Sequence, residues 1–323
     1  MKEFDVVGLG YCAVDYLGIV PRYPELDEKM QMTEFRRQGG GLIATAMATV
    51  GRLGGRAAYI GKVGDDDFGK FIIAELRKDG VDTSNVVIQP GAASQFSFIV
   101  VDQATGKRTI FWTPADLTLE PEDISREAIL AGKVLQVDAH HRRAAIRAAT
   151  WANQAGVPVV MDAGSVRVGS AELVERTDYL IASAKFAREF TGESDPGEAA
   201  RRMLRGRRKL SAVTLGEEGC VYATADGTFH QPAFRVNVVD TTGAGDVFHG
   251  AFSFGLAKGW EAPRIIEFAS AVAAIKCTKL GGRAGIPTLD QTLVFLRENS
   301  NHGCTEDTEA ENGRMGDRES LEL

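Results

Sequence analysis

The stretch Asp240-Thr241-Thr242-Gly243-Ala244-Gly245-Asp246-Val247-Phe248-His249-Gly250 places small residues before a helix and a carboxylate in its first turn. The first N–H groups of a helix have no intrahelical partner and lie at the positive end of its dipole, so they bind phosphate well. Gly243, Ala244 and Gly245 would let a phosphoryl group approach these N–H groups closely. Asp246 then stands where a general base takes the proton of an attacking hydroxyl. The stretch predicts a phosphoryl-transfer site with Asp246 as a catalytic residue.

The same residues also fit a helix start without chemistry. In that interpretation Asp240 or Thr242 caps the first turn, and the glycines only form the bend before it. The length of the pattern favours the catalytic interpretation, because a base beside an anion-binding turn serves no purely structural purpose.

The composition is that of a globular protein. The 323 residues, 44% of them hydrophobic, suffice for one large domain or two average ones. No apolar run approaches the roughly 20 residues of a membrane span, and the first residues lack the basic and apolar regions of a signal peptide, so we expect a cytoplasmic protein without membrane contact. Four cysteines form no CxxC pair, which predicts neither a zinc site nor disulfides but buried, reduced thiols: Cys12, Cys220, Cys277 and Cys304.

The net charge of −7 is concentrated at the C-terminus. Residues 298–323 contain eight acidic residues and two arginines, a net charge of −6, which leaves −1 for everything before them. A nearly neutral body argues against nucleic acid as a partner. The segment 298–323 is poor in large apolar residues, so we expect a disordered tail; an acidic partner-binding segment is the alternative.

Apolar runs alternate with segments of helical periodicity over most of the chain. Helices are expected at 42–52 and 68–78, with a strand at 57–63 between them, and a further helix at 196–205, capped by Asp195. Strands are expected at 4–8, 134–138, 157–162, 179–182 and 212–215. This rhythm predicts an α/β fold with a mostly parallel sheet and helices on both faces.

Two regions, 11–37 and 91–115, contain strand-like pieces and turn residues but no helical pattern. A basic cluster at 201–209 is interpreted as a solvated helix end rather than a binding patch.

A second block, GGGLIATAMATVGRLGGRAAYIGKVGDDDFG at 39–69, precedes the stretch around Asp246. Together the two blocks resemble the two signatures of the ribokinase-like, or PfkB-type, carbohydrate kinases. The resemblance implies a three-layer α/β/α sandwich with a small β lid over residues 1–297, the lid coming from 11–37 and 91–115. It implies ATP-dependent phosphorylation of a sugar or nucleoside hydroxyl, Mg²⁺ as cofactor, and a homodimer formed through the lid.

The resemblance also implies a set of sugar-binding residues. Asp15 matches an aspartate that accepts hydrogen bonds from sugar hydroxyls, although an ordinary turn carboxylate is the alternative. Thr45 stands where the family often has asparagine, so the substrate does not follow from ribokinase itself. The residues implied at the sugar are Asp15, Gly40, Gly41, Thr45, Arg108, Trp112 and His140.

A further set is implied at the nucleotide and at cations. Asp240 and the carbonyl of Thr242 match part of a monovalent-cation site, so K⁺ is an implied additional cofactor. Ser183 and Phe186 replace the asparagine and glutamate of an Asn-x-x-Glu motif that organises magnesium, so Mg²⁺ is expected to arrive with ATP and to be held through water. The residues implied at the nucleotide are Ser183, Thr214, Gly216, Gly219, Ser270, Gly281 and Gly282.

The blocks HQPAFRVNVVDTTGAGDVFHGAF, FASAVAAIKCT and GGRAGIP look especially like the 6-deoxy-6-sulfofructose kinase branch. This implies a ketose-type substrate with an anionic end. The arginine of that branch is not matched, because His140 stands at its strand end and Trp112 replaces a polar lid residue. Either the cluster 140–143 rebuilds an anion pocket, or the protein serves another sugar; a solvated helix start is equally compatible with that cluster. A non-catalytic sugar- or nucleotide-binding regulator is the rival to a kinase.

Overall fold

A large mixed β-sheet forms the centre of the molecule. The computed structural model describes residues 2–113 and 115–300. The strand order is β15-β14-β13-β12-β11-β10-β1-β4-β6, parallel from β6 to β13 and antiparallel at β14 and β15. Its strands are β1 Phe4–Leu9, β4 Ala57–Ile60, β6 Val81–Asp82, β10 Gly132–Val137, β11 Val159–Ala163, β12 Tyr179–Ser183, β13 Leu210–Thr214, β14 Cys220–Thr224 and β15 Gly227–Gln231.

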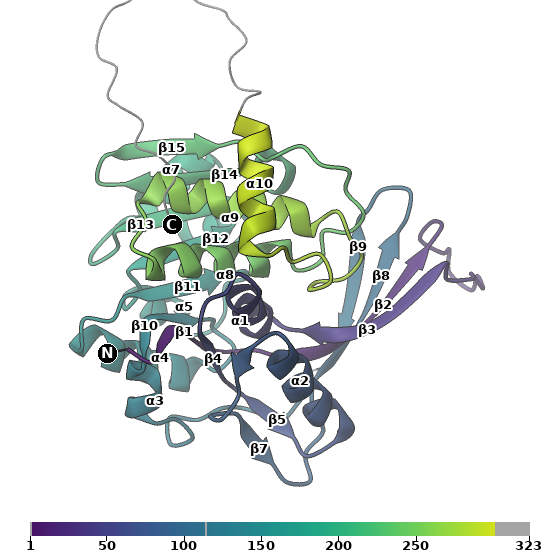
Figure 1. Cartoon of the computed structure of the whole chain (residues 1–323), viewed down its shortest axis with the longest axis horizontal. Coiled ribbons are helices and arrows are strands. Elements are labelled where there is room, and N and C mark those ends of the chain that lie inside the picture. The colour runs from purple at the N-terminus through teal and green to yellow at the C-terminus, as the bar shows by residue number, and fades with distance from the viewer. Residues whose placement is uncertain (1, 114, 301–323) are drawn as a thin grey trace, which may run out of the picture.

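Helices cover both faces of this sheet, because alternate strand residues point to opposite sides. Val6 belongs to one hydrophobic core and Val7 to the other. The first core is closed by α1 Leu42–Arg52, α2 Asp67–Lys78, α8 Ala244–Ala257 and α9 Ala262–Lys276. The second is closed by α3 Arg126–Leu130, α4 Arg142–Gln154, α5 Ser170–Val174, α6 Ala184–Thr191 and α7 Pro196–Met203, while α10 Leu289–Ser300 packs on α9 (Figure 1).

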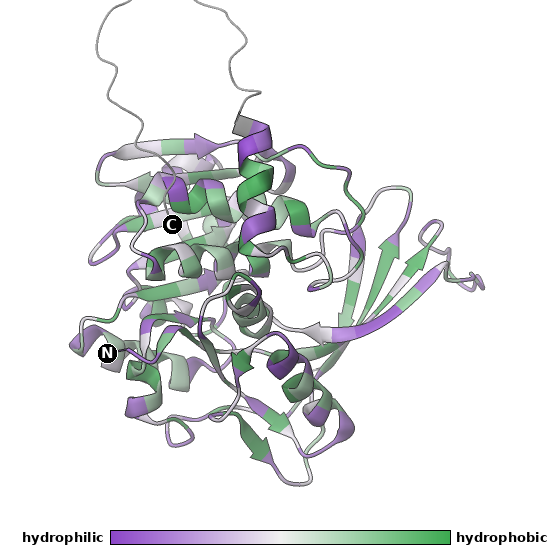
Figure 2. Cartoon of the chain, in the orientation of Figure 1, coloured by the Kyte–Doolittle hydropathy of each residue, from purple (hydrophilic) through white to green (hydrophobic). Residues whose placement is uncertain are grey.

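A smaller sheet projects to one side of the body as a lid (Figure 1). Its strand order is β3-β2-β8-β9, with β8 largely hydrophobic and β3 largely hydrophilic (Figure 2). Its strands are β2 Ala13–Val20, β3 Glu34–Gly40, β8 Phe96–Asp102 and β9 Arg108–Trp112. Two short strands, β5 Lys62–Gly64 and β7 Val87–Gln89, pair with each other outside both sheets.

The expected parallel sheet with helices on both faces is confirmed, and the predicted strands and helices recur with ends shifted by a few residues. The single strand expected at 57–63 is wrong, because it divides at Gly61 into β4 and β5. A Cβ at Gly61 would lie 2.1 Å from the Tyr59 hydroxyl, so the chain bends where only glycine fits. Helix α10 ends at Ser300, three residues into the predicted tail; the rest of that tail lies outside the described residues.

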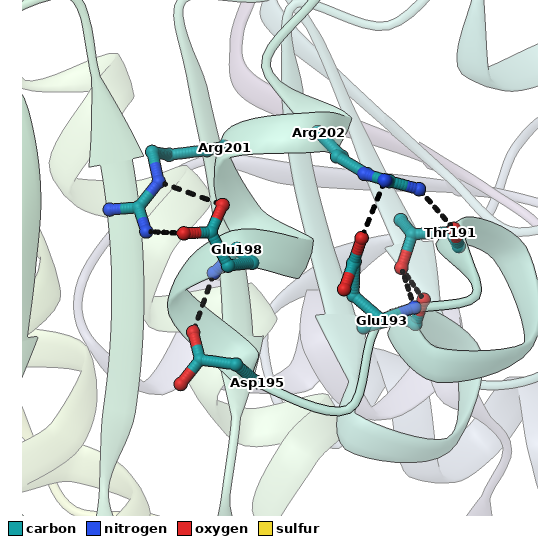
Figure 3. A network of polar contacts seen from close by, with 7 residues as sticks. Thr191, Glu193, Asp195, Glu198, Arg201 and Arg202 are labelled. Carbon is teal, nitrogen blue, oxygen red and sulfur yellow. Dashed lines mark hydrogen bonds and ion pairs between the residues drawn. The ribbon is translucent and has the colours of Figure 1, made fainter.

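Three arginines of the basic cluster at 201–209 pair with carboxylates, and two of these pairs are drawn in Figure 3. Arg202 lies 2.6 Å from Glu193, Arg201 pairs with Glu198, and Asp195 accepts a 2.7 Å hydrogen bond from the Glu198 N–H (Figure 3). Arg207 binds Asp178 at 2.9 Å. These exposed, internally paired arginines match the predicted solvated helix end.

Two expectations from composition can be compared with the structure. Among the described residues no helix is both long and apolar enough to cross a bilayer. Cys12, Cys220 and Cys277 are buried free thiols, as predicted, and Cys304 lies outside the described residues.

Candidate active site

Two cavities meet at the N-terminus of α8. The smaller, about 370 Å³, lies between the lid and the ends of β1, β10 and β11; the larger, about 930 Å³, lies beside β13, α8 and α9. The chain runs outward from β1 to β4 and returns to β10 on the other side of β1, and ligands bind at such a switch point, beyond the carboxyl ends of the strands. Gly245 lines both cavities, so the anion-binding turn connects them.

The turn before α8 leaves the N-terminus of the helix without a side-chain cap. Gly243 is the N-cap residue at φ 73°, a left-handed conformation that favours glycine, and no side chain caps the helix. A Cβ on Gly243 would lie 3.0 Å from Cα of Gly282. Capping by Asp240 or Thr242 is therefore wrong, and the N–H groups of the first turn keep the geometry that an anion requires.

Asp240 fixes this turn from below. Its carboxylate is fully buried and accepts 2.8 Å hydrogen bonds from the N–H groups of Thr242 and Gly281. The lid reaches the same turn, because Arg108 Nη1 donates to Thr241 Oγ1 at 2.9 Å. The turn is thus fastened to the loop after α9 on one side and to β9 on the other.

Asp246 lines the smaller cavity from the first turn of α8. Burial and the charge of Asp162 raise the pKa of Asp246 to about 7, while His249 and Arg108 oppose the shift. A carboxyl group with a pKa near neutrality can both accept and return a proton, which suits a general base.

Asp162 and His249 form a buried pair next to this carboxyl group, although neither residue is among the site residues predicted above. Asp162 Oδ2 lies 3.4 Å from His249 Nδ1, and burial together with the charge of Asp138 raises the pKa of Asp162 to about 8. His249 also faces two carbonyls, Gly245 O at 2.7 Å and Ile181 O at 3.2 Å. Burial lowers the pKa of His249, although both carbonyls favour its protonated form.

Asp15 lines the smaller cavity from the lid strand β2. Burial raises its pKa to about 7, Arg283 opposes the shift, and the charge of Asp246 adds to it. A Cβ on Gly40 would lie 2.0 Å from Asp15 Oδ2, so Gly40 makes room for the carboxylate rather than lining the cavity. Gly41, at φ 87°, does line it.

The end of the cavity beyond β10 carries an aromatic and basic cluster. His140 stacks on Tyr11 with ring centroids 4.5 Å apart, and its Nδ1 lies 3.4 Å from Asp138 Oδ1. Arg167 Nη2 lies 2.8 Å from His140 Nε2; because arginine only donates, the imidazole nitrogen accepts. Trp112 lines the same cavity from β9.

Asp138 is the buried carboxylate that orders this cluster. It accepts 2.8 Å hydrogen bonds from the N–H groups of Tyr11 and His140. Burial alone would raise the pKa of Asp138, but His140 and the Tyr11 N–H bring it below its usual value. Asp138 therefore remains a carboxylate at neutral pH.

The anion pocket expected from residues 140–143 is only partly correct. His140 lines the cavity, but His141 is buried and accepts from the Leu119 N–H. Arg143 pairs with Glu120 at 2.8 Å, and both Arg142 and Arg143 line a separate surface depression. Because α4 begins at Arg142, neither Arg142 nor Arg143 lines the smaller cavity. Arg167, in the loop before α5, lines it instead.

The larger cavity is lined by most of the residues predicted to bind the nucleotide. Its lining includes Thr214, Gly216, Gly219 and Ser270, together with Lys107 at the β8–β9 turn. Its volume falls within the range of ligand pockets and is more than twice that of the smaller cavity. The size difference suits a nucleotide in one cavity and a sugar in the other.

Four other predicted ligand residues lie behind the cavities and do not line them. Thr45 is buried, and its Oγ1 accepts a 3.3 Å hydrogen bond from Arg283 Nε. Ser183 caps α6 by accepting from the Phe186 N–H at 3.0 Å. Gly281 donates to Asp240, and Gly282 lies under Gly243. These residues support the site from below.

The arrangement offers few groups for direct metal binding. Within residues 2–113 and 115–300, no group of three or more His, Cys, Asp or Glu side chains is placed to hold a metal ion. Ser183 is engaged as a helix cap, and Phe186 is buried against Phe190. The replaced Asn-x-x-Glu motif therefore provides no carboxylate here.

A lid over two connected cavities, with a carboxyl group and an anion-binding turn where they meet, defines a small-molecule kinase. The profile described as pfkB family carbohydrate kinase matches residues 3–289. The chain therefore belongs to the pfkB family, and it is an ATP-dependent carbohydrate kinase with the ribokinase-like fold. The family expected from the two sequence blocks is confirmed.

The chain is similar to several kinases that are named for different sugars. The chain is 30% identical to Fructokinase-1 of Zea mays over 320 residues, covering 91% of this chain and 98% of that one. It is 28% identical to 5-dehydro-2-deoxygluconokinase of Geobacillus kaustophilus over 324 residues, covering 93% and 96%. The solved ribokinase of Thermotoga maritima superposes with a TM-score of 0.77 at 26% identity, covering 91% and 99%.

Proposed function

We propose that this kinase transfers the γ-phosphoryl group of ATP to a primary hydroxyl of a sugar bound in the smaller cavity. The observation that carries the proposal is that Gly245 and Asp246 lie in one helical turn. Gly245 lines both cavities, and Asp246 lines the smaller one, in which we place the sugar. The nucleotide lies in the larger cavity along Thr214, Gly216 and Ser270.

The chemistry follows from these positions. The N–H groups of the Gly243-Ala244-Gly245 turn and the guanidinium of Arg108 stabilise the negative charge of the transferring group. Asp246 accepts the proton of the sugar hydroxyl, and Asp15 orients the sugar by accepting from its other hydroxyls. Mg²⁺ bound with ATP would neutralise phosphate charge, and it would be held mainly through water, because Ser183 and Phe186 offer no carboxylate.

The favoured substrate is a ketose or sugar acid with an anionic end, with 6-deoxy-6-sulfofructose the best specific candidate. Arg167 supports this choice, because it lines the sugar cavity and its contact with His140 leaves further donors available. The 5-dehydro-2-deoxygluconokinase relative is named for a sugar acid, whereas the fructokinase relatives favour a neutral ketose as the alternative. Ribose, 2-keto-3-deoxygluconate and nucleosides complete the panel.

The lid supports the proposal of a homodimer. Phe35, Phe98 and Phe111 are each more than half exposed (56%, 52% and 53%), and Tyr16 stacks between Phe35 and Phe98. Apolar surface of this kind marks a contact site. A second copy is the proposed occupant because a lid contact between identical chains is the assembly that the family resemblance implies.

The first prediction concerns the base. Asp246→Asn keeps the shape of the side chain but removes the proton acceptor, so we expect the turnover number to fall by about 10²-fold or more. ATP binding, measured by calorimetry, and the melting temperature should stay close to wild type. Turnover within a few-fold of wild type would show that Asp246 is not the base. An ATP-consumption assay that detects no turnover on any sugar of the panel would instead favour a non-catalytic regulator.

The second prediction concerns pH. Because a base works as the carboxylate and the pKa of Asp246 is about 7, kcat/KM should fall as pH decreases through about 7 and level off above it. Asp162 and Asp246 titrate in the same pH range, and the ionised fraction of Asp162 raises the pKa of Asp246, so Asp162→Asn should move this acid limb to lower pH. Full pH profiles of both enzymes test this, and an acid limb that stays in place in Asp162→Asn contradicts the coupling.

The third prediction concerns substrate charge. A hydrogen bond to a charged group contributes roughly 1.5 to 3 kcal/mol, so Arg167→Ala should raise KM for an anionic sugar by about tenfold or more, and His140→Ala should act in the same direction. Arg143→Ala is the matched control, because Arg143 pairs with Glu120 outside the cavity. The substrates are sulfofructose, 2-keto-3-deoxygluconate, fructose and ribose. A wild-type preference for a neutral sugar, or equal losses on all four, refutes the anion pocket.

The fourth prediction concerns assembly. Phe98→Asp places a charge in the proposed lid contact, so the molar mass measured by light scattering should fall from dimer to monomer. Val238→Asp, on an exposed position in the loop before the anion-binding turn, is the control and should leave the mass unchanged. A wild-type protein that is monomeric at micromolar concentration rules out the lid dimer.

A further inference from the structure

Lys276, the last residue of α9, carries a side chain with no exposed surface. Its Nζ donates a 2.8 Å hydrogen bond to the carbonyl oxygen of Asp240, a residue that is also completely buried. A fully buried lysine is rare and is costly unless a negative group compensates its charge. Burial lowers the pKa of Lys276, and the charge of the same Asp240 is the strongest effect that opposes this shift and favours the ammonium form.

The surroundings of Lys276 join two segments far apart in the sequence. The N–H groups of Val239 and Asp240 donate to the carbonyl of Cys277 at 2.9 and 3.2 Å. Gly281 then donates to the Asp240 carboxylate. The ammonium therefore lies where the end of α9 contacts the segment that leads into the anion-binding turn.

These contacts do not fit the monovalent cation implied for Asp240 and Thr242. Each carboxylate oxygen of Asp240 already accepts a backbone N–H, and its carbonyl accepts the lysine ammonium. A K⁺ ion at the same segment would compete with these donors and would stand near a second positive charge in a buried environment, where like charges repel strongly.

We propose that Lys276 is a tethered cation that replaces a free monovalent cation in this kinase. Its ammonium compensates the buried charge of Asp240 and thereby holds the Thr242–Gly245 turn in the anion-binding conformation. Lys276 is a positioning residue, since it acts through Asp240 and the turn. The inference rests on the proposed function only for its activity readout; the thermal readout below does not require a substrate.

The first experiment uses the wild-type enzyme. Activity is compared in KCl, NaCl and tetramethylammonium chloride at equal ionic strength, with potassium-free ATP. We expect the three rates to agree within about twofold, because the positive charge is part of the chain. Activation by KCl of more than about fivefold over tetramethylammonium chloride would overturn the proposal.

The second experiment removes the tethered charge. Lys276→Ala leaves space for a small cation beside Asp240, so KCl or NH₄Cl should raise its melting temperature and its rate relative to tetramethylammonium chloride. Lys276→Met fills most of that space with an apolar chain and should lose activity without rescue. Lys279→Ala, at an exposed position three residues later, is the matched control and should behave as wild type.

The two readouts separate this inference from the proposed function. If the wild type phosphorylates no sugar, the proposed function fails, while cation-specific stabilisation of ligand-free Lys276→Ala still supports the tethered cation. If Lys276→Ala folds with wild-type stability and rate in every salt, or if the wild type itself gains stability from KCl alone, the tethered cation is wrong.

Discussion

The buried carboxylate of Asp240 is the constraint on which the active site depends. One oxygen holds the N–H of Thr242 and the other holds the N–H of Gly281, so two loops separated by about forty residues share one anchor. The anchor brings the loop after α9 under the turn, where Gly282 leaves space for Gly243. Gly243 can then adopt its left-handed conformation and leave the helix uncapped. Together with the contact of Arg108 with Thr241, this anchor holds the segment that leads into α8, and phosphate binding by backbone N–H groups requires such a fixed turn.

Four carboxyl groups line one small cavity, three of them buried and Asp246 half-buried, and their surroundings divide them into two kinds. Asp138 keeps a lowered pKa because His140 and the Tyr11 N–H offset the effect of burial. Asp15, Asp162 and Asp246 have raised pKa values, because burial and the charge of a neighbouring carboxylate outweigh the effect of nearby basic groups. One group therefore serves as a permanent anion, whereas the others titrate near neutrality. Environments that push the pKa values of neighbouring carboxyl groups apart are what acid–base chemistry at neutral pH requires.

The sequence predicted the layers of the fold and the central turn, because both are encoded locally. Buried strands and amphipathic helices have their own periodicities, and the glycines around Asp246 mark a helix that opens without a side-chain cap. The predicted ligand residues that do not line a cavity were misplaced because their position depends on long-range geometry. Thr45 and Ser183 carry hydroxyl groups that could bind a ligand, but these groups form hydrogen bonds with other parts of the protein behind the cavities. Arg167 was missed because nothing in its loop indicates that it meets His140, twenty-seven residues earlier in the chain. Lys276 was missed because a lysine at a helix end usually lies in solvent.

The period-two alternation of the lid strands couples substrate binding to the proposed assembly. Ser97 and Ile99 of β8 line the sugar cavity, and Phe98 between them points outward. On β9, Ile110 and Trp112 line the cavity, while Phe111 is on the other side. A partner that packs against the outer aromatic side chains fixes the same backbone segments that carry the inner ones. Pre-ordering these strands lowers the entropy that the sugar must otherwise overcome when it orders them, so a dimer formed through the lid favours sugar binding without contributing any residue to the cavity.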